Sequence, residues 1–87
     1  MTRYFVYVVR CSDGSLYTGW TTDVAARVAQ HNVKKGAKYT RSRLPVALVY
    51  REQLPSRQAA LLREREIKKL SRQEKNSLLY VQPVKGV

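Results

Sequence analysis

The chain has 87 residues, the size of one domain with a single small core. Seventeen Lys and Arg residues against six Asp and Glu give a net charge of +11, which favours a polyanionic partner, most commonly nucleic acid. An apolar content of 44% with only four glycines and three prolines argues against a disordered tail.

The first third of the chain has the pattern of a β-hairpin followed by a helix. Residues 3–11 are rich in β-branched and aromatic side chains, Asp13-Gly14 is a turn signal, and residues 15–20 fit the return strand. Residues 23–33 then carry valine and alanine pairs at helical spacing, which predicts a helix.

The rest of the chain predicts one strand and two helices. A basic loop over 33–45 precedes an apolar run of strand length over 46–52, and Ser56 is an N-cap residue for a helix over 57–70. Ser71-Arg72-Gln73-Glu74 has the capping-box pattern, so another helix is expected from there towards Tyr80. The predicted order is ββαβαα, in one domain over residues 1–82 with a loose tail over 83–87.

The sequence also bears on location. The apolar run near the N-terminus is short and is followed by no small-residue cleavage site, and no segment reaches the length of a membrane span. The single cysteine, Cys11, excludes an internal disulfide and a zinc site built from cysteines. We therefore expect a cytoplasmic protein without a membrane partner.

Acidic side chains are scarce, and most have a structural explanation. Asp13 belongs to the turn, Asp23 to a helix start and Glu74 to the capping box, while Glu52 ends a strand and is expected to be solvated. Two remain, Glu64 and Glu66, in the helix over 57–70.

On a helical wheel, Glu64 falls inside the apolar sector that contains Ala60 and Ile67, whereas Glu66 lies at its flank. An inward carboxylate needs a partner, a hydrogen-bond network or a metal. One alternative is an ion pair with Lys68, four residues on, or with an arginine across the core.

Arg27 and His31 are also four residues apart, which puts them on one face of the predicted helix. A solvated face explains such a pair. The functional alternative is a phosphate site, because a guanidinium binds two phosphate oxygens and an imidazole exchanges a proton near neutral pH.

These residues together resemble a known family. Phe5-Val6-Tyr7 and Tyr17-Thr18-Gly19 are similar to the paired "GIY" and "YIG" elements of the GIY-YIG nuclease superfamily, and the matching arginine, histidine and glutamate follow in order as Arg27, His31 and Glu64. The resemblance covers about residues 3–80 and is closest to the small single-domain bacterial members, the UPF0213-like proteins. It implies an α+β fold, a small and mainly antiparallel three-stranded sheet flanked by helices.

The resemblance also implies roles for these residues. Tyr7 would act as general base or orient the attacking water, Tyr17 would hydrogen-bond the phosphate or the water, and His31 would share the proton transfer. Arg27 would bind the scissile phosphate. Glu64 matches the single metal-binding carboxylate of the family, and Mg²⁺, with Mn²⁺ as a substitute, suits one carboxylate plus substrate oxygens.

Three residues depart from the family pattern: Phe5, Thr18 and Trp20. Phe5 and Thr18 supply no chemistry. Trp20 is either a stacking surface for an unpaired base, which would favour single-stranded or branched DNA, or a residue packed against the first helix.

The sequence therefore predicts a metal-dependent DNA endonuclease acting on single-stranded, branched or duplex DNA; the alternative is a basic nucleic-acid-binding module without catalysis. The basic loop is expected to follow the DNA backbone unless it is only solvated. The expected nucleic-acid contacts are Gly19, Trp20, Lys34, Lys35, Lys38, Tyr39, Arg41, Arg43 and Lys68.

Overall fold

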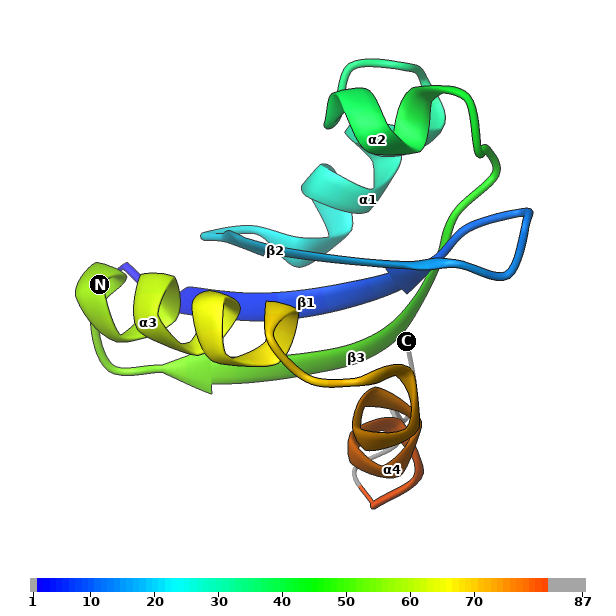
Figure 1. Cartoon of the computed structure of the whole chain (residues 1–87). Helices are drawn as coiled ribbons and strands as arrows, with labels where there is room; N and C mark the ends of the chain where they lie inside the picture. Colours follow the sequence, from blue (N-terminus) through cyan, green and yellow to red (C-terminus); the bar gives the residue numbers. More distant parts are fainter. Residues whose placement is uncertain (1, 82–87) are drawn as a thin grey trace.

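The computed structural model describes residues 2–81 and consists of a three-stranded antiparallel sheet with helices on both faces (Figure 1). The strands are β1 (Tyr4–Arg10), β2 (Leu16–Thr21) and β3 (Ala47–Leu54), and β1 lies in the centre of the order β2-β1-β3. The helices are α1 (Val24–Asn32), α2 (Lys38–Arg41), α3 (Arg57–Lys68) and α4 (Arg72–Val81). The predicted α+β class and three-stranded sheet are confirmed.

Two boundaries bear on the predictions. The basic loop contains a short helix, α2, which the sequence analysis missed because four residues are too few to show a periodic pattern. The predicted tail over 83–87 lies outside the described residues.

The register of the hairpin places the two motif tyrosines on one face of the sheet. Tyr7 pairs with Gly19, and Tyr17 pairs with Val9, so the tyrosines are diagonal neighbours. The turn between the strands contains Gly14, whose φ of 84° is the left-handed conformation that glycine adopts readily.

Alternation along β1 divides the core into two layers. Phe5, Tyr7 and Val9 face α1 and pack with Val24 and other buried side chains. Val6 and Val8 face α3 and pack with Tyr50, Ala60 and Ile67. Since β1 is buried on both sides, its sequence is a nearly continuous apolar run.

Side-chain caps set the ends of the helices, as the sequence predicts. The Asp23 carboxylate accepts from the amide of Ala26, and Ser56 Oγ accepts from the amide of Ala59. Ser71 and Glu74 form the reciprocal capping box at the start of α4. Glu52, in contrast, is not simply solvated: its carboxylate accepts from Arg63 at 2.8 Å, so that expectation is wrong.

The core layer between the sheet and α3 predicts how much a substitution there lowers the free energy of unfolding. Ile67 is fully buried there, so Ile67→Ala is expected to lower the free energy of unfolding by about 2–5 kcal/mol through lost burial and an unfilled cavity. Urea denaturation followed by circular dichroism measures the change. Leu62→Ala on the same helix is the matched control, because Leu62 is 50% exposed and should cost far less. Equal losses for the two variants would contradict this packing.

Candidate active site

The candidate site lies along β2, which is an edge strand, where side chains from α1 and α3 meet the hairpin. Tyr7 comes from β1, Tyr17 and Gly19 from β2, and His31 from α1. The ring centroids of Tyr7 and Tyr17 lie 5.9 and 5.4 Å from that of His31, both edge-on. The structure thus brings together three of the residues predicted from sequence.

Tyr7 and His31 form a buried hydrogen-bonded pair. The Tyr7 hydroxyl lies 2.8 Å from His31 Nε2, and both side chains are almost fully inaccessible to solvent. Burial raises the pKa of Tyr7, although the nearby guanidinium of Arg27 opposes the shift. Burial, and then the charge of Arg27, lowers the pKa of His31. A solvated face is therefore the wrong explanation for His31, because its ring is fully buried.

Two glycines make this packing possible. A Cβ added at Gly19 would lie 2.6 Å from the Tyr7 hydroxyl, and one added at Gly36 would press into the His31 ring. Gly19 thus leaves space for the Tyr7 side chain, and this role is independent of any contact with a bound phosphate. No sequence pattern predicts the packing of Gly36 against His31; the only signal is its position in the basic loop, five residues after His31.

Arg27 contributes a donor to the site. Its side chain is half-buried, and Nη1 donates to Gln30 Oε1 at 3.2 Å. Its Nε–H is buried and has no hydrogen-bond partner among residues 2–81. A buried donor without a partner costs about 1–3 kcal/mol, and this N–H could donate to a bound acceptor such as a phosphate oxygen.

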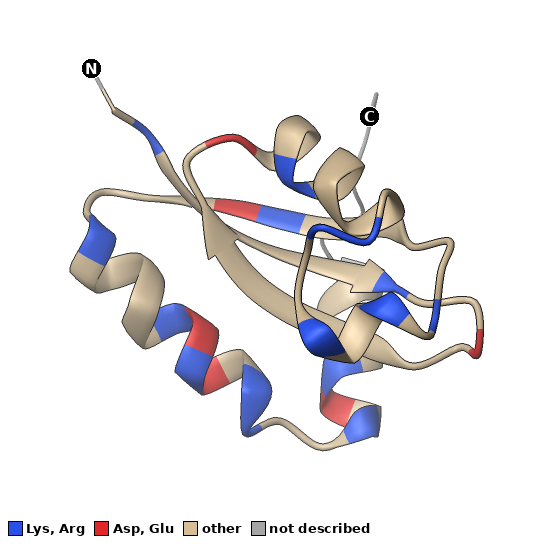
Figure 2. Ribbon diagram, turned by 90° about the horizontal axis from the view of Figure 1, so that it is seen from above, with Lys and Arg blue, Asp and Glu red and all other residues tan. Residues whose placement is uncertain are grey.

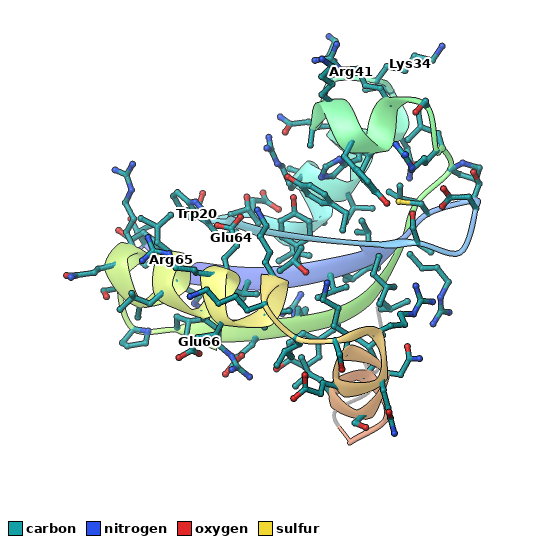
Figure 3. The ribbon with its side chains drawn as sticks, viewed as in Figure 1. Trp20, Lys34, Arg41, Glu64, Arg65 and Glu66 are labelled. Carbon is teal, nitrogen blue, oxygen red and sulfur yellow. The ribbon has the colours of Figure 1, made fainter. Side chains whose placement is uncertain are left out.

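Glu64 lies on the side of α3 that faces β2, whereas Glu66 points away (Figure 3). The Glu64 side chain is 17% exposed, and its Oε2 pairs with Lys68 Nζ at 2.7 Å, as the ion-pair alternative from sequence predicts. The same Lys68 Nζ lies 5.8 Å from the centre of the Tyr17 ring. Glu64 also acts on Tyr7 by charge, as one of the smaller influences raising its pKa. Through Lys68, the Glu64 carboxylate thus lies close to Tyr17.

Glu64 is the one carboxylate that the described part of the candidate site offers to a metal ion. No group of three or more His, Cys, Asp or Glu side chains gathers within residues 2–81, which disfavours a two-metal centre in that part of the chain. Glu64 lines a surface pocket of about 340 Å³ with Lys68 and Lys69. One carboxylate can suffice for Mg²⁺, which retains waters and takes its other ligands from the substrate. Here Glu64 is paired with Lys68, and Arg65 and Lys69 also line the pocket, so a metal ion would have to displace the Lys68 ammonium.

The DNA contacts predicted in the basic loop divide into two groups. Lys34, Lys35, Lys38 and Arg41 are exposed on and before α2, and Figures 2 and 3 show this basic region at one end of the molecule. Tyr39 and Arg43 are instead engaged internally: Tyr39 stacks on Tyr17, and Arg43 lies over Tyr39 and pairs with Asp13.

Trp20 lies on the α3 face of the sheet, packed against the cluster around Val6 with Arg57 over its ring. Packing against the first helix is therefore a wrong expectation. Trp20 also lines a pocket with Thr21, Thr22 and Arg27, so part of it faces the site.

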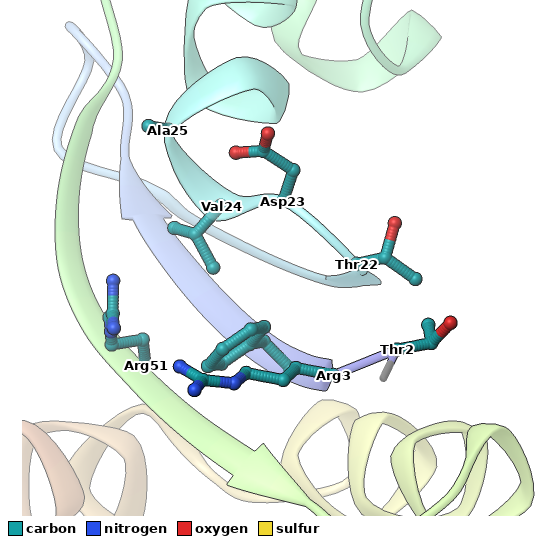
Figure 4. Close-up of a pocket in the computed structure, with 8 residues that line it drawn as sticks. Thr2, Arg3, Thr22, Asp23, Val24, Ala25 and Arg51 are labelled. Atoms are coloured by element: carbon teal, nitrogen blue, oxygen red, sulfur yellow. The ribbon is translucent and has the colours of Figure 1, made fainter.

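Another pocket, larger than the one beside Glu64, lies elsewhere. It measures about 410 Å³ and sits at the start of β1 and α1, where Arg3 and Arg51 reach its rim (Figure 4). It contains none of Tyr7, His31 or Glu64, so we do not place the chemistry there.

Comparison with known proteins gives the family of the chain. The model of the GIY-YIG catalytic domain matches residues 3–77. The chain belongs to the GIY-YIG family. Among GIY-YIG relatives, UPF0213 protein SH2523 of Staphylococcus haemolyticus is 54% identical over 79 residues, covering 91% of this chain and 96% of that protein. A UPF0213 protein of Staphylococcus aureus is 56% identical over the same coverage.

Two solution NMR structures have the same GIY-YIG architecture. UPF0213 protein BH0048 of Bacillus halodurans superposes with a TM-score of 0.60 at 47% identity, covering 91% of this chain and 84% of that one. Protein EF2693 of E. faecalis gives a TM-score of 0.63 at 37% identity, with 93% and 86% covered. In the described part of this chain, no helix combines the length and hydropathy needed to cross a bilayer.

The buried histidine predicts how stability depends on pH. Because folding lowers the pKa of His31 below its ordinary 6.5, the unfolded chain binds a proton that the native state rejects. The free energy of unfolding should therefore fall as pH drops from 7 to 5. The pKa values of Asp13 and Glu74 are also lowered, but these groups lose their contributions to the free energy of unfolding only below their ordinary pKa values of 3.8 and 4.5.

Urea denaturation at several pH values checks this prediction, with His31→Gln as the comparison. The variant should lose most of the slope between pH 7 and 5. A native chain that is equally stable at both pH values would contradict a neutral, buried His31.

Proposed function

We propose that the protein is a metal-dependent endonuclease that hydrolyses phosphodiester bonds of DNA. The observation that carries the proposal is the 2.8 Å hydrogen bond between the Tyr7 hydroxyl and His31 Nε2, together with the buried Nε–H of Arg27, which has no hydrogen-bond partner within residues 2–81. A general base and a phosphate-binding donor are the two protein groups that hydrolysis of a phosphodiester needs most.

His31 Nε2 lies 2.8 Å from the Tyr7 oxygen, so a neutral imidazole is placed to accept the Tyr7 proton. Burial lowers the pKa of His31 and raises that of Tyr7, and both shifts oppose a complete transfer, so the proton moves only as Tyr7 takes one from the attacking water. The Tyr7 oxygen can then take a proton from a water that attacks phosphorus. Arg27 binds a non-bridging oxygen of the phosphate and offsets the charge that develops there.

Glu64 would hold the divalent ion, Mg²⁺ or Mn²⁺, which when bound stabilises the negative charge on the phosphate and leaving oxygens. Lys68, between Glu64 and Tyr17, supplies a further positive charge to the same pocket.

The substrate follows from the surface. The exposed lysines and arginine on and before α2 contact the DNA backbone, and Trp20, beside Arg27, stacks on an unpaired base, which favours single-stranded or branched DNA. A free, buried Cys11 fits the reducing cytoplasm that we propose as its location.

The test is a panel of labelled single-stranded, duplex and branched DNA, with RNA of the same sequence, incubated with Mg²⁺ or with EDTA. Metal-dependent cutting, faster on single-stranded or branched DNA than on duplex, is expected. Tight binding without cutting on every substrate would support the binding-module alternative. Binding should weaken steeply with salt in either case, because the chain is strongly basic.

A further inference from the structure

We propose that Thr40 is a positioning residue that fixes the tautomer of His31. Its hydroxyl holds the imidazole proton on Nδ1 and so leaves the lone pair of Nε2 for Tyr7. The sequence analysis gave Thr40 no role, and it lies nine residues from His31 in a different helix.

Three hydrogen bonds form a series that runs from Tyr7 through His31 and Thr40 to the backbone carbonyl of Ala37. The direction of each bond follows from that carbonyl, which is the last acceptor. The carbonyl of Ala37 can only accept, and Thr40 Oγ1 lies 2.9 Å from it, so the hydroxyl donates its one proton there. Thr40 Oγ1 then offers only lone pairs to His31 Nδ1, which lies 2.8 Å away and must carry the proton. Nε2 is left as an acceptor, and the Tyr7 hydroxyl donates to it.

The surroundings enforce this arrangement. Thr40 and His31 are both fully buried, so bulk water does not compete for either group. The amide of Thr40 donates to the same Ala37 carbonyl at 3.1 Å, which ties the side chain to the first turn of α2. Gly36 packs against the imidazole where a Cβ would collide with Nδ1, and this contact restricts movement of the ring.

The tautomer decides the direction of proton transfer. With the proton on Nε2, the imidazole would donate to the Tyr7 oxygen and could not receive a proton from it. A wrong histidine tautomer is costly in catalysis, as the asparagine variant of the serine protease triad illustrates. The effect on rate rests on the proposed function, whereas the tautomer itself does not.

The test uses the fact that His31 is the only histidine in the chain, so ring ¹⁵N shifts in a labelled sample report it alone. At pH 7.5 the wild type should show a protonated Nδ1 and an unprotonated Nε2. Thr40→Val, which keeps the shape but loses the hydroxyl, should move the proton wholly or partly to Nε2, and Thr40→Ser should retain the wild-type pattern. Thr18→Val is the control for the spectrum, because Thr18 pairs with Val8 and faces the other side of the sheet.

Cleavage provides the second measurement. Thr40→Val should slow single-turnover cleavage about 10- to 100-fold with DNA affinity unchanged, and Thr40→Ser should restore most of the rate. A wild type protonated on Nε2, or a Thr40→Val variant that keeps the wild-type ¹⁵N pattern, would overturn the inference, even if the variant is slow. If no substrate is cut but the ¹⁵N pattern responds as expected, the proposed function fails and the positioning of His31 by Thr40 stands.

Discussion

Glu64→Gln is expected to abolish metal-dependent cleavage while the fold and the DNA affinity stay close to those of the wild type. The amide keeps the size of the side chain and removes the charge that would hold Mg²⁺. A bound metal contributes several kcal/mol of transition-state stabilisation, and each 1.36 kcal/mol is tenfold in rate, so the loss should exceed about 100-fold. The partner Lys68 is half-exposed, so losing the ion pair should cost little stability.

Glu66→Gln is the matched control for this experiment. Glu66 lies on the same helix two residues away and is also paired, with Arg63 at 3.2 Å, but its side chain is 66% exposed and points away from the site. Cleavage should be unchanged in this variant. Cleavage by Glu64→Gln at the wild-type rate in Mg²⁺ would show that the metal assignment is wrong. Isothermal calorimetry with Mn²⁺ would separate lost metal binding from lost chemistry.

Arg27→Ala is expected to slow cleavage about 100- to 1000-fold and to weaken DNA binding much less. The expected size is that for losing one preorganised donor to developing charge. Binding should survive because sixteen other Lys and Arg side chains remain of the seventeen in the chain. Arg27→Lys should also be slow, since an ammonium cannot reproduce the planar donor set of a guanidinium.

Arg41→Ala supplies the contrast. Arg41 is exposed on α2, away from the Tyr7–His31 pair, so its loss should weaken binding and lower the salt slope by about one, with the single-turnover rate of bound DNA retained. Single-turnover kinetics and binding isotherms for the two variants measure both quantities. Equal losses of rate and affinity in Arg27→Ala would argue against a role in the transition state.

Much of the fold was predictable because its signals are local. The turn at Asp13-Gly14, the caps at Asp23 and Ser56 and the box at Ser71 and Glu74 each act within a few residues, and the structure contains all of them. The order ββαβαα followed from these signals and from apolar periodicity. Only α2 was missed.

The gathering of the site could be expected from sequence only through the family resemblance. Helical periodicity placed Arg27 and His31 on one face of the helix, but it did not decide whether that face is solvated or part of a functional site. Burial of His31 depends on Gly36 and Thr40, and neither contact has a periodic signal. The hairpin register, which makes Tyr7 and Tyr17 diagonal neighbours, likewise depends on turn geometry and packing.

Long-range polar contacts also could not be predicted from the sequence. Glu52 appeared to be a solvated strand end, but Arg63 reaches it from α3 at 2.8 Å. Such pairs join residues that are distant in sequence, so spacing alone does not reveal them.

His31 has a consequence for how this protein can change over time. Its ring is hydrogen-bonded at both nitrogens, to β1 through Tyr7 and to α2 through Thr40, so one side chain joins three elements of the fold. Replacing it would remove the hydrogen bond of the buried Tyr7 hydroxyl to the imidazole and leave the Thr40 hydroxyl with only the Ala37 carbonyl, which costs stability whether or not any DNA is cut. Selection for a folded chain alone would therefore act to retain this imidazole, and the proton-accepting group would be preserved even in a lineage that had no use for the reaction.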